Sequence, residues 1–223
     1  AHLAKVDQSS VGTNWGVGDI MYADLDGDGK ISNGTNKLGD TGDYRIIGNS
    51  TPRFKYGITL DAAWKGFDFS IFMQGIGKRD LWLDGCYFWG ANGQGNEWQS
   101  TGFAEHWDFF RPEGDPLGAN LNSYYPRVNF SGDRNTKVQT RYLQNGAYLR
   151  LKNVQLGYTL PRVWTEKAGI SSVRVYVSGD NLATITSLSK IFDPEATGSL
   201  AGTGSGKLYP LQRVISVGVN VNF

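Results

Sequence analysis

Apolar and polar residues alternate with a period of two along several long stretches of the chain. This period is typical of antiparallel strands that have one apolar and one polar face. The stretches that alternate are 53–64, 67–74, 173–180 and 213–223. The first two are joined by the two residues Lys65-Gly66, and Phe72 is the one exception to the pattern of the second. We therefore expect long antiparallel strands, with a tight hairpin at Lys65-Gly66.

Three details of these strands favour a transmembrane β-barrel. They run to about ten residues or more, where strands usually have about five or six. Charged residues stand in mid-strand on the polar face, as a wet lumen tolerates: Asp61, Asp68 and Arg174. Aromatic residues gather at the strand ends near the short turns, as in the girdles of outer-membrane barrels: Trp64, Phe67, Tyr158, Trp164 and Phe223. A soluble β-sandwich is the alternative fold.

On the barrel interpretation, the polar face of the strands shapes a hydrated wall of the lumen. The candidates for this wall are Lys55, Thr59, Asp61, Asp68, Ser70, Gln74, Arg174, Tyr176 and Asn220.

One further strand, within 147–161, does not alternate cleanly. Val154, Leu156 and Tyr158 share one face, but Leu149 and Leu151 have the opposite parity. A β-bulge near Asn153 would explain the switch, and so would a strand end that rises above the apolar band. The sequence leaves both explanations open.

The lengths of the connections indicate how the strands cross the membrane. The connections at 65–66 and 161–171 are short, whereas 1–52, 80–147 and 186–212 are long, and bacterial outer-membrane barrels alternate short periplasmic turns with long extracellular loops in this way. Because even small barrels need about eight strands, these strands form only a piece of a barrel. The expected division is an extracellular loop at 1–52, a strand hairpin at 53–79, a long extracellular loop at 80–147 and the last three strands at 148–223.

The composition excludes several classes of function. The formal net charge is +1, with 22 basic and 21 acidic residues that are scattered along the chain, so nothing indicates a nucleic-acid binder. A single cysteine, Cys86, permits neither an intramolecular disulfide nor a cysteine-rich metal site. His2 and His106 are the only histidines, and no catalytic triad, Walker loop or zinc spacing is present. We expect no enzymatic activity.

Two long stretches carry a family resemblance. The stretch "GDIMYADLDGDGKIS…DYRIIGNSTPRFKYGITLDAAWKGFDFSIFMQG" and the tail "YLRLKNVQLGYTLP…GISSVRVYVSGDNLATIT…FDPE…YPLQRVISVGVNVNF" resemble the SusC/RagA-like TonB-dependent outer-membrane transporters of Bacteroidota. Several separate motifs occur in the order of that family. They cover most of the chain outside 80–140, and the tail resembles the C-terminal end of the family.

The resemblance implies a role in nutrient uptake across the Gram-negative outer membrane. Such transporters have an N-terminal plug inside a 22-stranded barrel, and these residues resemble only the last five or so strands, with the plug absent. The family imports bulky nutrients, mostly oligosaccharides and in some members peptides. A SusD-like surface lipoprotein covers the extracellular mouth, and TonB supplies the energy. A last strand that ends in Phe223 resembles the signal by which such barrels are recognised for insertion.

A short acidic stretch, "DLDGDGKIS", has the spacing of a calcium loop. Carboxylates at positions 1, 3 and 5, a glycine at 6 and a backbone carbonyl at 7 are supplied by Asp24, Asp26, Asp28, Gly29 and Lys30. Three carboxylates in five residues repel one another unless a cation or solvent screens them. We expect a structural Ca²⁺ that cross-links an extracellular loop, with a solvated turn as the alternative.

The twelfth position of the calcium loop, which normally supplies a bidentate carboxylate, is Thr35. The family-like sequence resumes at "DYRIIGN", so the resemblance implies Asp43 as the substitute ligand, with Asp40 as the second choice.

The long loop at 80–147 is rich in tryptophan and asparagine. Its aromatic rings could stack on sugars or pack against a partner lipoprotein, and we favour packing against the partner. The residues to test are Trp82, Trp89, Trp98 and Trp107. The alternative function for the whole chain is a soluble, calcium-stabilised carbohydrate-binding β-sandwich.

Overall fold

The computed structural model describes residues 5–93, 102–132, 134–197 and 208–223. The chain divides into two compact units. Within the described residues, one unit takes in 5–48 and most of 82–143 and is called the loop unit below. The other takes in 49–81, 144–197 and 208–223 and is called the sheet unit.

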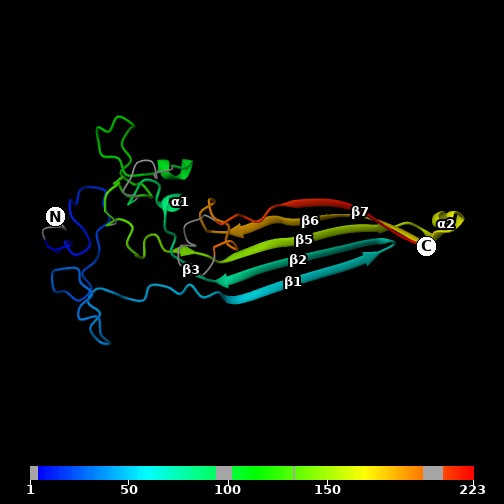
Figure 1. The fold of residues 1–223 in the computed structure, drawn as a ribbon, viewed down its shortest axis with the longest axis horizontal. Helices are drawn as coiled ribbons and strands as arrows, with labels where there is room; N and C mark the ends of the chain where they lie inside the picture. The colour runs from blue at the N-terminus through cyan, green and yellow to red at the C-terminus, as the bar shows by residue number, and fades with distance from the viewer. Residues whose placement is uncertain (1–4, 94–101, 133, 198–207) are drawn as a thin grey trace. The chain divides into compact units, whose positions relative to one another are not determined.

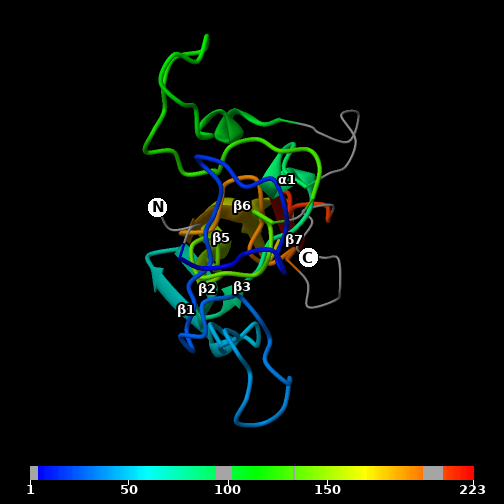
Figure 2. The ribbon, with the colours of Figure 1, turned by 90° about the vertical axis from the view of Figure 1, so that its left-hand side faces the viewer.

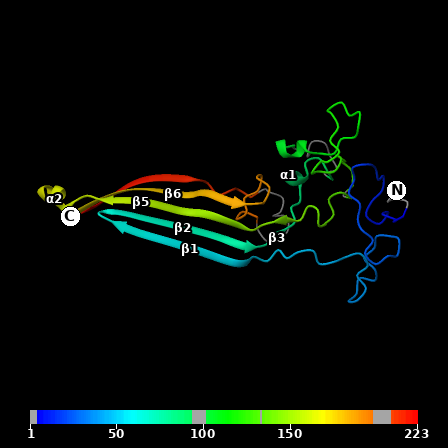
Figure 3. The ribbon, with the colours of Figure 1, turned by 180° about the vertical axis from the view of Figure 1, so that it is seen from behind.

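The sheet unit is built on one antiparallel sheet whose strand order follows the chain, as Figures 1 and 3 show from two sides. Its strands are β1 (Arg53–Trp64), β2 (Phe67–Lys78), β5 (Tyr148–Thr159), β6 (Ser172–Thr186) and β7 (Val214–Asn222). A small second sheet pairs β3 (Asp80–Leu81) with β4 (Gln144–Asn145).

The helices that the structure describes are all short. They are α1 (Cys86–Trp89) and η2 (Ala104–Trp107) in the loop unit, and α2 (Arg162–Thr165) and η3 (Glu166–Ala168) between β5 and β6. In the part of the chain that the structure describes, no helix combines the length and the apolar character needed to cross a membrane.

The first hairpin follows directly from its sequence. Lys65 and Gly66 both have positive φ angles, of 47° and 88°, as a two-residue type I′ turn requires. The turn sets Trp64 opposite Phe67, and from there the register continues through Ala62 opposite Phe69. Because the side chains of a strand alternate between the two faces, this register puts the apolar residues of both strands on the same face.

The same register continues across the whole sheet. One row of the apolar face runs through Ala62, Phe69, Leu156, Val177 and Val217, and the row beside it on the polar face runs through Ala63, Asp68, Gly157, Tyr176 and Gly218. Seen along the strands, the sheet follows an arc rather than a plane (Figure 2). The predicted all-β antiparallel fold is confirmed. The described strands form an open sheet, so the closed 22-stranded barrel stays a prediction.

A β-bulge explains the irregular parity of β5. The pairing with β2 shifts between Phe72 and Met73, so that Asn153 is opposite Phe72 and Leu151 is opposite Met73. Leu151 and Leu149 thereby join the apolar face, and Arg150 joins the polar face. Of the two explanations left open by the sequence, the bulge near Asn153 is correct.

The buried core of the described residues lies mostly outside the sheet. The most deeply buried large side chains are Tyr142, Phe88 and Leu83, all in the loop unit. By contrast, apolar residues of the sheet are exposed, with Val217 at 76% and Ile215 at 70%. A soluble sheet protein would cover such a face.

Candidate transport surface and cation site

An ion pair crosses three strands on the polar face of the sheet. Arg174 of β6 donates to both carboxylate oxygens of Asp68 on β2, through Nε at 2.8 Å and through Nη2, and it also donates to Gln155 of β5 at 3.2 Å. Gly157 of β5 lies beneath the pair, where a Cβ atom would come within 2.5 Å of both charged groups. The guanidinium also stacks on Tyr176, 4.9 Å from the ring centroid. The ion pair therefore ties β2 to β6 across β5.

The other residues predicted to line the lumen share this polar face by register. They are Lys55, Thr59, Asp61, Ser70, Gln74 and Asn220. Phe72 is the apolar exception on this face, and its ring lies 3.2 Å from the position that a Cβ atom of Gly57 would occupy. The arrangement is an extended polar surface and does not gather these residues at one point.

A second charged network holds the loop between β6 and β7 against the sheet. Arg150 of β5 donates to Asp193 at 2.6 Å, to Glu195 at 2.7 Å and to Thr184 of β6 at 2.8 Å. Glu195 also accepts from Lys152 at 3.1 Å and from the Tyr148 hydroxyl at 3.1 Å. We call this network the Arg150 clamp.

Asp193 extends the clamp to two stretches of backbone. One of its oxygens accepts from the Glu195 N–H at 2.9 Å and the other from the Leu211 N–H at 3.1 Å. Burial alone would raise the pKa of Asp193, but the hydrogen bonds from Arg150 and from these two N–H groups outweigh it and lower the pKa. The carboxylate is therefore charged at neutral pH. The sequence motif "FDPE" signalled this segment, but nothing in the sequence pointed to Arg150 as its partner.

The acidic loop brings three carboxylates together in the loop unit. One oxygen from each of Asp24, Asp26 and Asp28 lies within 4.8 Å of the others, as ligands of one cation must. Backbone N–H groups of Gly29 and Gly27 donate to Asp24 and lower its pKa. Because these donors bind the ionised form, they favour a charged ligand set. This geometry fits a hard cation such as Ca²⁺.

The two carboxylates considered for the last ligand position behave differently. Asp43 lies against the loop, where its oxygens accept from the N–H groups of Leu25 at 2.6 Å and Ser32 at 2.8 Å. Asp40 instead accepts two hydrogen bonds from Thr35, one from the Thr35 hydroxyl at 2.6 Å and one from the Thr35 N–H at 3.1 Å. Asp43 is thus beside the acidic loop but outside the cluster of three. Lys30 lies within the loop, and its Nζ is 3.6 Å from Asp28.

The tryptophans singled out in the sequence have different surroundings. Trp89 is buried, at 3% exposed, against Tyr142 and half-buried Trp82. Trp107 is 59% exposed, with the guanidinium of Arg111 over its ring. Trp98 lies outside the described residues. Of the three that the structure describes, Trp107 has the ring most available to a partner or a sugar.

His106 links Phe103 to α1 within the loop unit. Its Nδ1 accepts from the Phe103 N–H at 3.0 Å, and its Nε2 lies 3.1 Å from the carbonyl oxygens of Tyr87 and Phe88. Nε2 therefore carries the hydrogen and the ring is neutral. Burial lowers the pKa of His106, although its carbonyl partners and Glu105 oppose this effect.

Comparisons with known proteins point to one class of membrane protein. The chain is 33% identical over 216 residues to TonB-dependent receptor P3 of Formosa agariphila, which covers 92% of the chain and 19% of the relative. It is 29% identical over 229 residues to TonB-dependent receptor P26 of the same organism, which covers 98% of the chain and 21% of the relative. The chain thus spans about a fifth of the length of these relatives. No protein-family model matches the chain.

Solved structures agree with the sequence comparison. The RagAB peptide importer in its open-open state matches with a TM-score of 0.61 and 28% identity, over 80% of the chain and 18% of that structure's chain. The closed-closed state of the same importer matches with a TM-score of 0.57 and 27% identity, over 80% and 18% respectively. The relatives are named as receptors and the solved structures as a peptide importer, which agrees with the prediction that the chain is no enzyme.

Proposed function

We propose that the chain is the C-terminal part of a SusC/RagA-like TonB-dependent receptor and that it forms a section of an outer-membrane barrel that imports bulky nutrients. The apolar face of the sheet would contact lipid and the polar face would line the lumen. The observation that carries the proposal is the exposed apolar face, which spans all five strands and is backed by a polar face with an ion pair. The same uncovered face counts against the alternative, a soluble carbohydrate-binding sandwich.

The proposed import is active and involves a partner. A SusD-like lipoprotein would cover the extracellular loops, TonB would act through parts of the receptor outside this chain, and the cargo would be oligosaccharides or peptides. The relatives named TonB-dependent receptors support the energy coupling, and the likeness to the RagAB peptide importer supports a two-protein importer. In this arrangement, Trp107 is the first candidate for a contact with the lipoprotein, and Phe223 would act as the insertion signal.

The proposal is tested in cells with and without the receptor that contains this chain. Uptake of a peptide mixture and of an oligosaccharide mixture is measured by mass spectrometry of the depleted medium. We expect cells without the receptor to lose uptake of one class of cargo, and re-expression of the receptor to restore it. A protonophore should abolish the restored uptake, because TonB draws on the proton gradient. Equal uptake of both mixtures by both strains would contradict the proposal.

We also propose that Asp24, Asp26 and Asp28 bind a structural Ca²⁺, with the backbone carbonyl of Lys30 and with Asp43 completing the ligand set. The cation would screen the repulsion among the clustered carboxylates. Chelation with EGTA should then make the segment 24–43 of the purified receptor exchange its amide hydrogens faster, and added Ca²⁺ should reverse the change.

Two single variants control the calcium experiment. Asp26→Asn should remove the effect of EGTA on hydrogen exchange, whereas Asp40→Asn should keep it, because Asp40 bonds to Thr35 and lies outside the cluster. Hydrogen exchange that is the same with EGTA and with Ca²⁺ in the native receptor would leave the solvated acidic turn as the explanation.

A further inference from the structure

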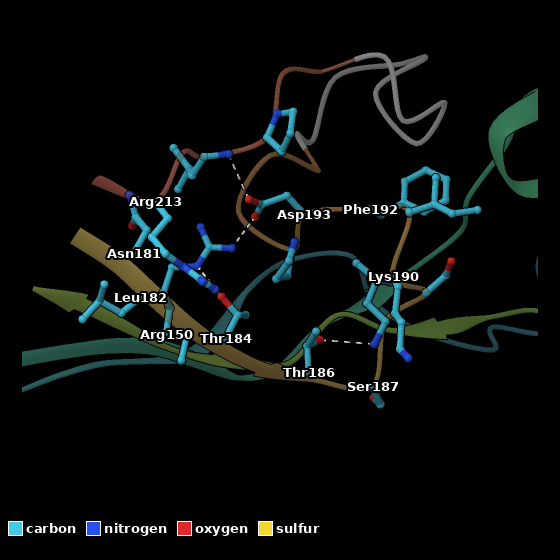
Figure 4. A pocket seen from close by; sticks show the side chains of 17 residues that line it. Arg150, Asn181, Leu182, Thr184, Thr186, Ser187, Lys190, Phe192, Asp193 and Arg213 are labelled. Atoms are coloured by element: carbon cyan, nitrogen blue, oxygen red, sulfur yellow. Dashed lines mark hydrogen bonds and ion pairs between the residues drawn. The ribbon is translucent and has the colours of Figure 1, made fainter. Parts of the chain in front are cut away.

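A pocket of about 820 Å³ lies in the sheet unit, at the end of the strands away from the short turns (Figure 4). Its lining comes from the end of β6, the loop residues 187–194 and the returning segment 210–213. Arg150 and Thr184 contribute to the lining, and both belong to the polar face of the sheet. If the proposed function is correct, the pocket is therefore on the lumen side at the extracellular end, where cargo first meets the barrel.

The walls of this pocket are fixed before any ligand arrives. The Arg150 clamp holds the loop at Asp193, and Asp193 in turn holds the N–H of Leu211 on the opposite wall. Asn181 of β6 donates to the carbonyl of Gln212 at 3.0 Å, and the Leu188 N–H donates to Thr186 at 3.2 Å. A ligand would therefore bind with little cost for ordering the site.

The lining carries an excess of positive charge. Arg150 is neutralised by its bonds to Asp193 and Glu195. Lys190 and Arg213 also line the pocket, and neither forms an ion pair or a hydrogen bond with any residue that the structure describes. In the view of Figure 4 they lie on opposite sides of the Arg150–Asp193 pair. Two cations at the edge of a fixed pocket would attract negative groups.

We propose that this pocket binds an oligomer that carries carboxylate groups, with Lys190 and Arg213 as the residues that select for them. Leu182 and Leu211 offer apolar surface to the body of the ligand, and the hydroxyl of Thr184 offers a polar contact. An acidic peptide and an oligosaccharide with uronic acids share this chemistry. The inference rests on the proposed function, since it names the class of cargo that the importer would select.

The test is equilibrium binding to the full receptor that contains this chain, purified in detergent with any lipoprotein that co-purifies. The acidic probes are a tetraglutamate peptide and trigalacturonate, and the matched neutral probes are tetraglutamine and galactotriose. We expect one acidic probe to bind more tightly than its neutral counterpart, and a rise in salt to weaken that binding. The acidic probe that binds identifies the source of the carboxylate.

The double variant Lys190→Gln/Arg213→Gln should weaken binding of that acidic probe about five- to tenfold, since partly exposed ion pairs each contribute modestly, and should leave the neutral probe unaffected. The control is Arg162→Gln/Lys167→Gln, which removes the same two charges at the far end of the sheet and should change neither affinity. The proposal is overturned by equal affinity of the native receptor for acidic and neutral probes, by failure of both acidic probes to bind, or by an unchanged affinity in the double variant.

Failure of the proposed function would be seen separately. If cells without the receptor take up both cargo mixtures as well as cells that have it, the import role is wrong whatever the probes do. If import depends on the receptor but the double variant imports and binds acidic cargo as the native receptor does, then only the assignment of this pocket is wrong.

Discussion

At the scale of single residues, Asp193 shows how one carboxylate can hold two separate stretches of backbone. It accepts from Arg150 and from the N–H groups of Glu195 and Leu211, and its side chain is only 9% exposed. Asp193→Asn keeps the shape but removes the charge, and hydrogen bonds to charged groups are worth about 1.5–3 kcal/mol. We expect amide exchange at Glu195 and Leu211 to become about 10- to 100-fold faster, measured by mass spectrometry on the receptor.

The control for that prediction is Asp115→Asn. Asp115 accepts from the Leu117 N–H in an exposed turn and has no arginine partner in the described residues. The variant Asp115→Asn should leave amide exchange at Glu195 and Leu211 unchanged. Unaltered exchange in Asp193→Asn itself would show that the charge of Asp193 does not hold these segments.

The Arg150 clamp also predicts a pH dependence. The pKa of Asp193 is lowered in the fold, so its contribution to stability is present above the ordinary carboxylate pKa of about 3.9 and is lost as the pH falls through the lower folded value. Protection at Glu195 and Leu211, corrected for the intrinsic exchange rate, should therefore be equal at pH 7 and pH 5. Loss of protection already at pH 5 would contradict the direction of this shift.

His106 predicts a pH response in a milder range. Its pKa is lowered by burial. The folded structure around His106 therefore loses stability as the pH falls from the ordinary histidine value of about 6.5 toward the folded pKa. Protonation would place a hydrogen on Nδ1, which now accepts from the Phe103 N–H. Protection in α1 and at Phe103, corrected for the intrinsic exchange rate, should decrease as the pH falls from 7.5 to 5.5. In His106→Gln this loss of protection should vanish, and if it persists another group is responsible.

At the scale of elements, the two faces of β7 give the sharpest test of a membrane-spanning sheet. Val217 is on the apolar face opposite Val177, and its neighbour Ser216 is on the polar face opposite Ser178. A lysine on a lipid-facing position costs about 2–4 kcal/mol near the middle of the bilayer, whereas the lumen face tolerates charge. Val217→Lys should reduce the amount of folded receptor in outer-membrane fractions, and Ser216→Lys should not. Equal yields of the two variants would argue against a lipid-facing side.

The elements that could be predicted from the sequence are those set by local rules. Alternation and the Lys65-Gly66 turn were enough to place β1, β2, β6 and β7, because strand period and turn type depend on neighbouring residues. The parity of β5 could not be settled, because the bulge is defined by its pairing with β2. The Arg150 clamp could not be predicted either, because Asp193 and Glu195 lie 43 and 45 residues from Arg150 in the chain. The acidic cluster was predictable because its spacing is local.

At the scale of the whole molecule, the sheet has two open edges within the described residues. β1 and β7 each pair on one side only, and the residues of β7 on the apolar face of the sheet are exposed. Unpaired edges of this kind associate with other strands. We therefore expect the chain expressed alone to aggregate in water and to be recovered in a detergent-stable form when the rest of the receptor is present, as judged by size-exclusion chromatography. A soluble, monodisperse species without detergent would contradict the barrel.

The irregularities of β5 and β6 also determine which insertions and deletions a lineage of such receptors can tolerate. Between paired positions, β5 has one residue, Lys152, where β6 has two, Asn181 and Leu182. Removing Lys152 would put Leu151 next to Asn153, as their partners Met73 and Phe72 are adjacent in β2, so Arg150 and Tyr148 would stay on the polar face. Removing both Asn181 and Leu182 would keep every face of β6 as it is. Length changes in β6 should thus accumulate in pairs, whereas β5 can lose Lys152 alone.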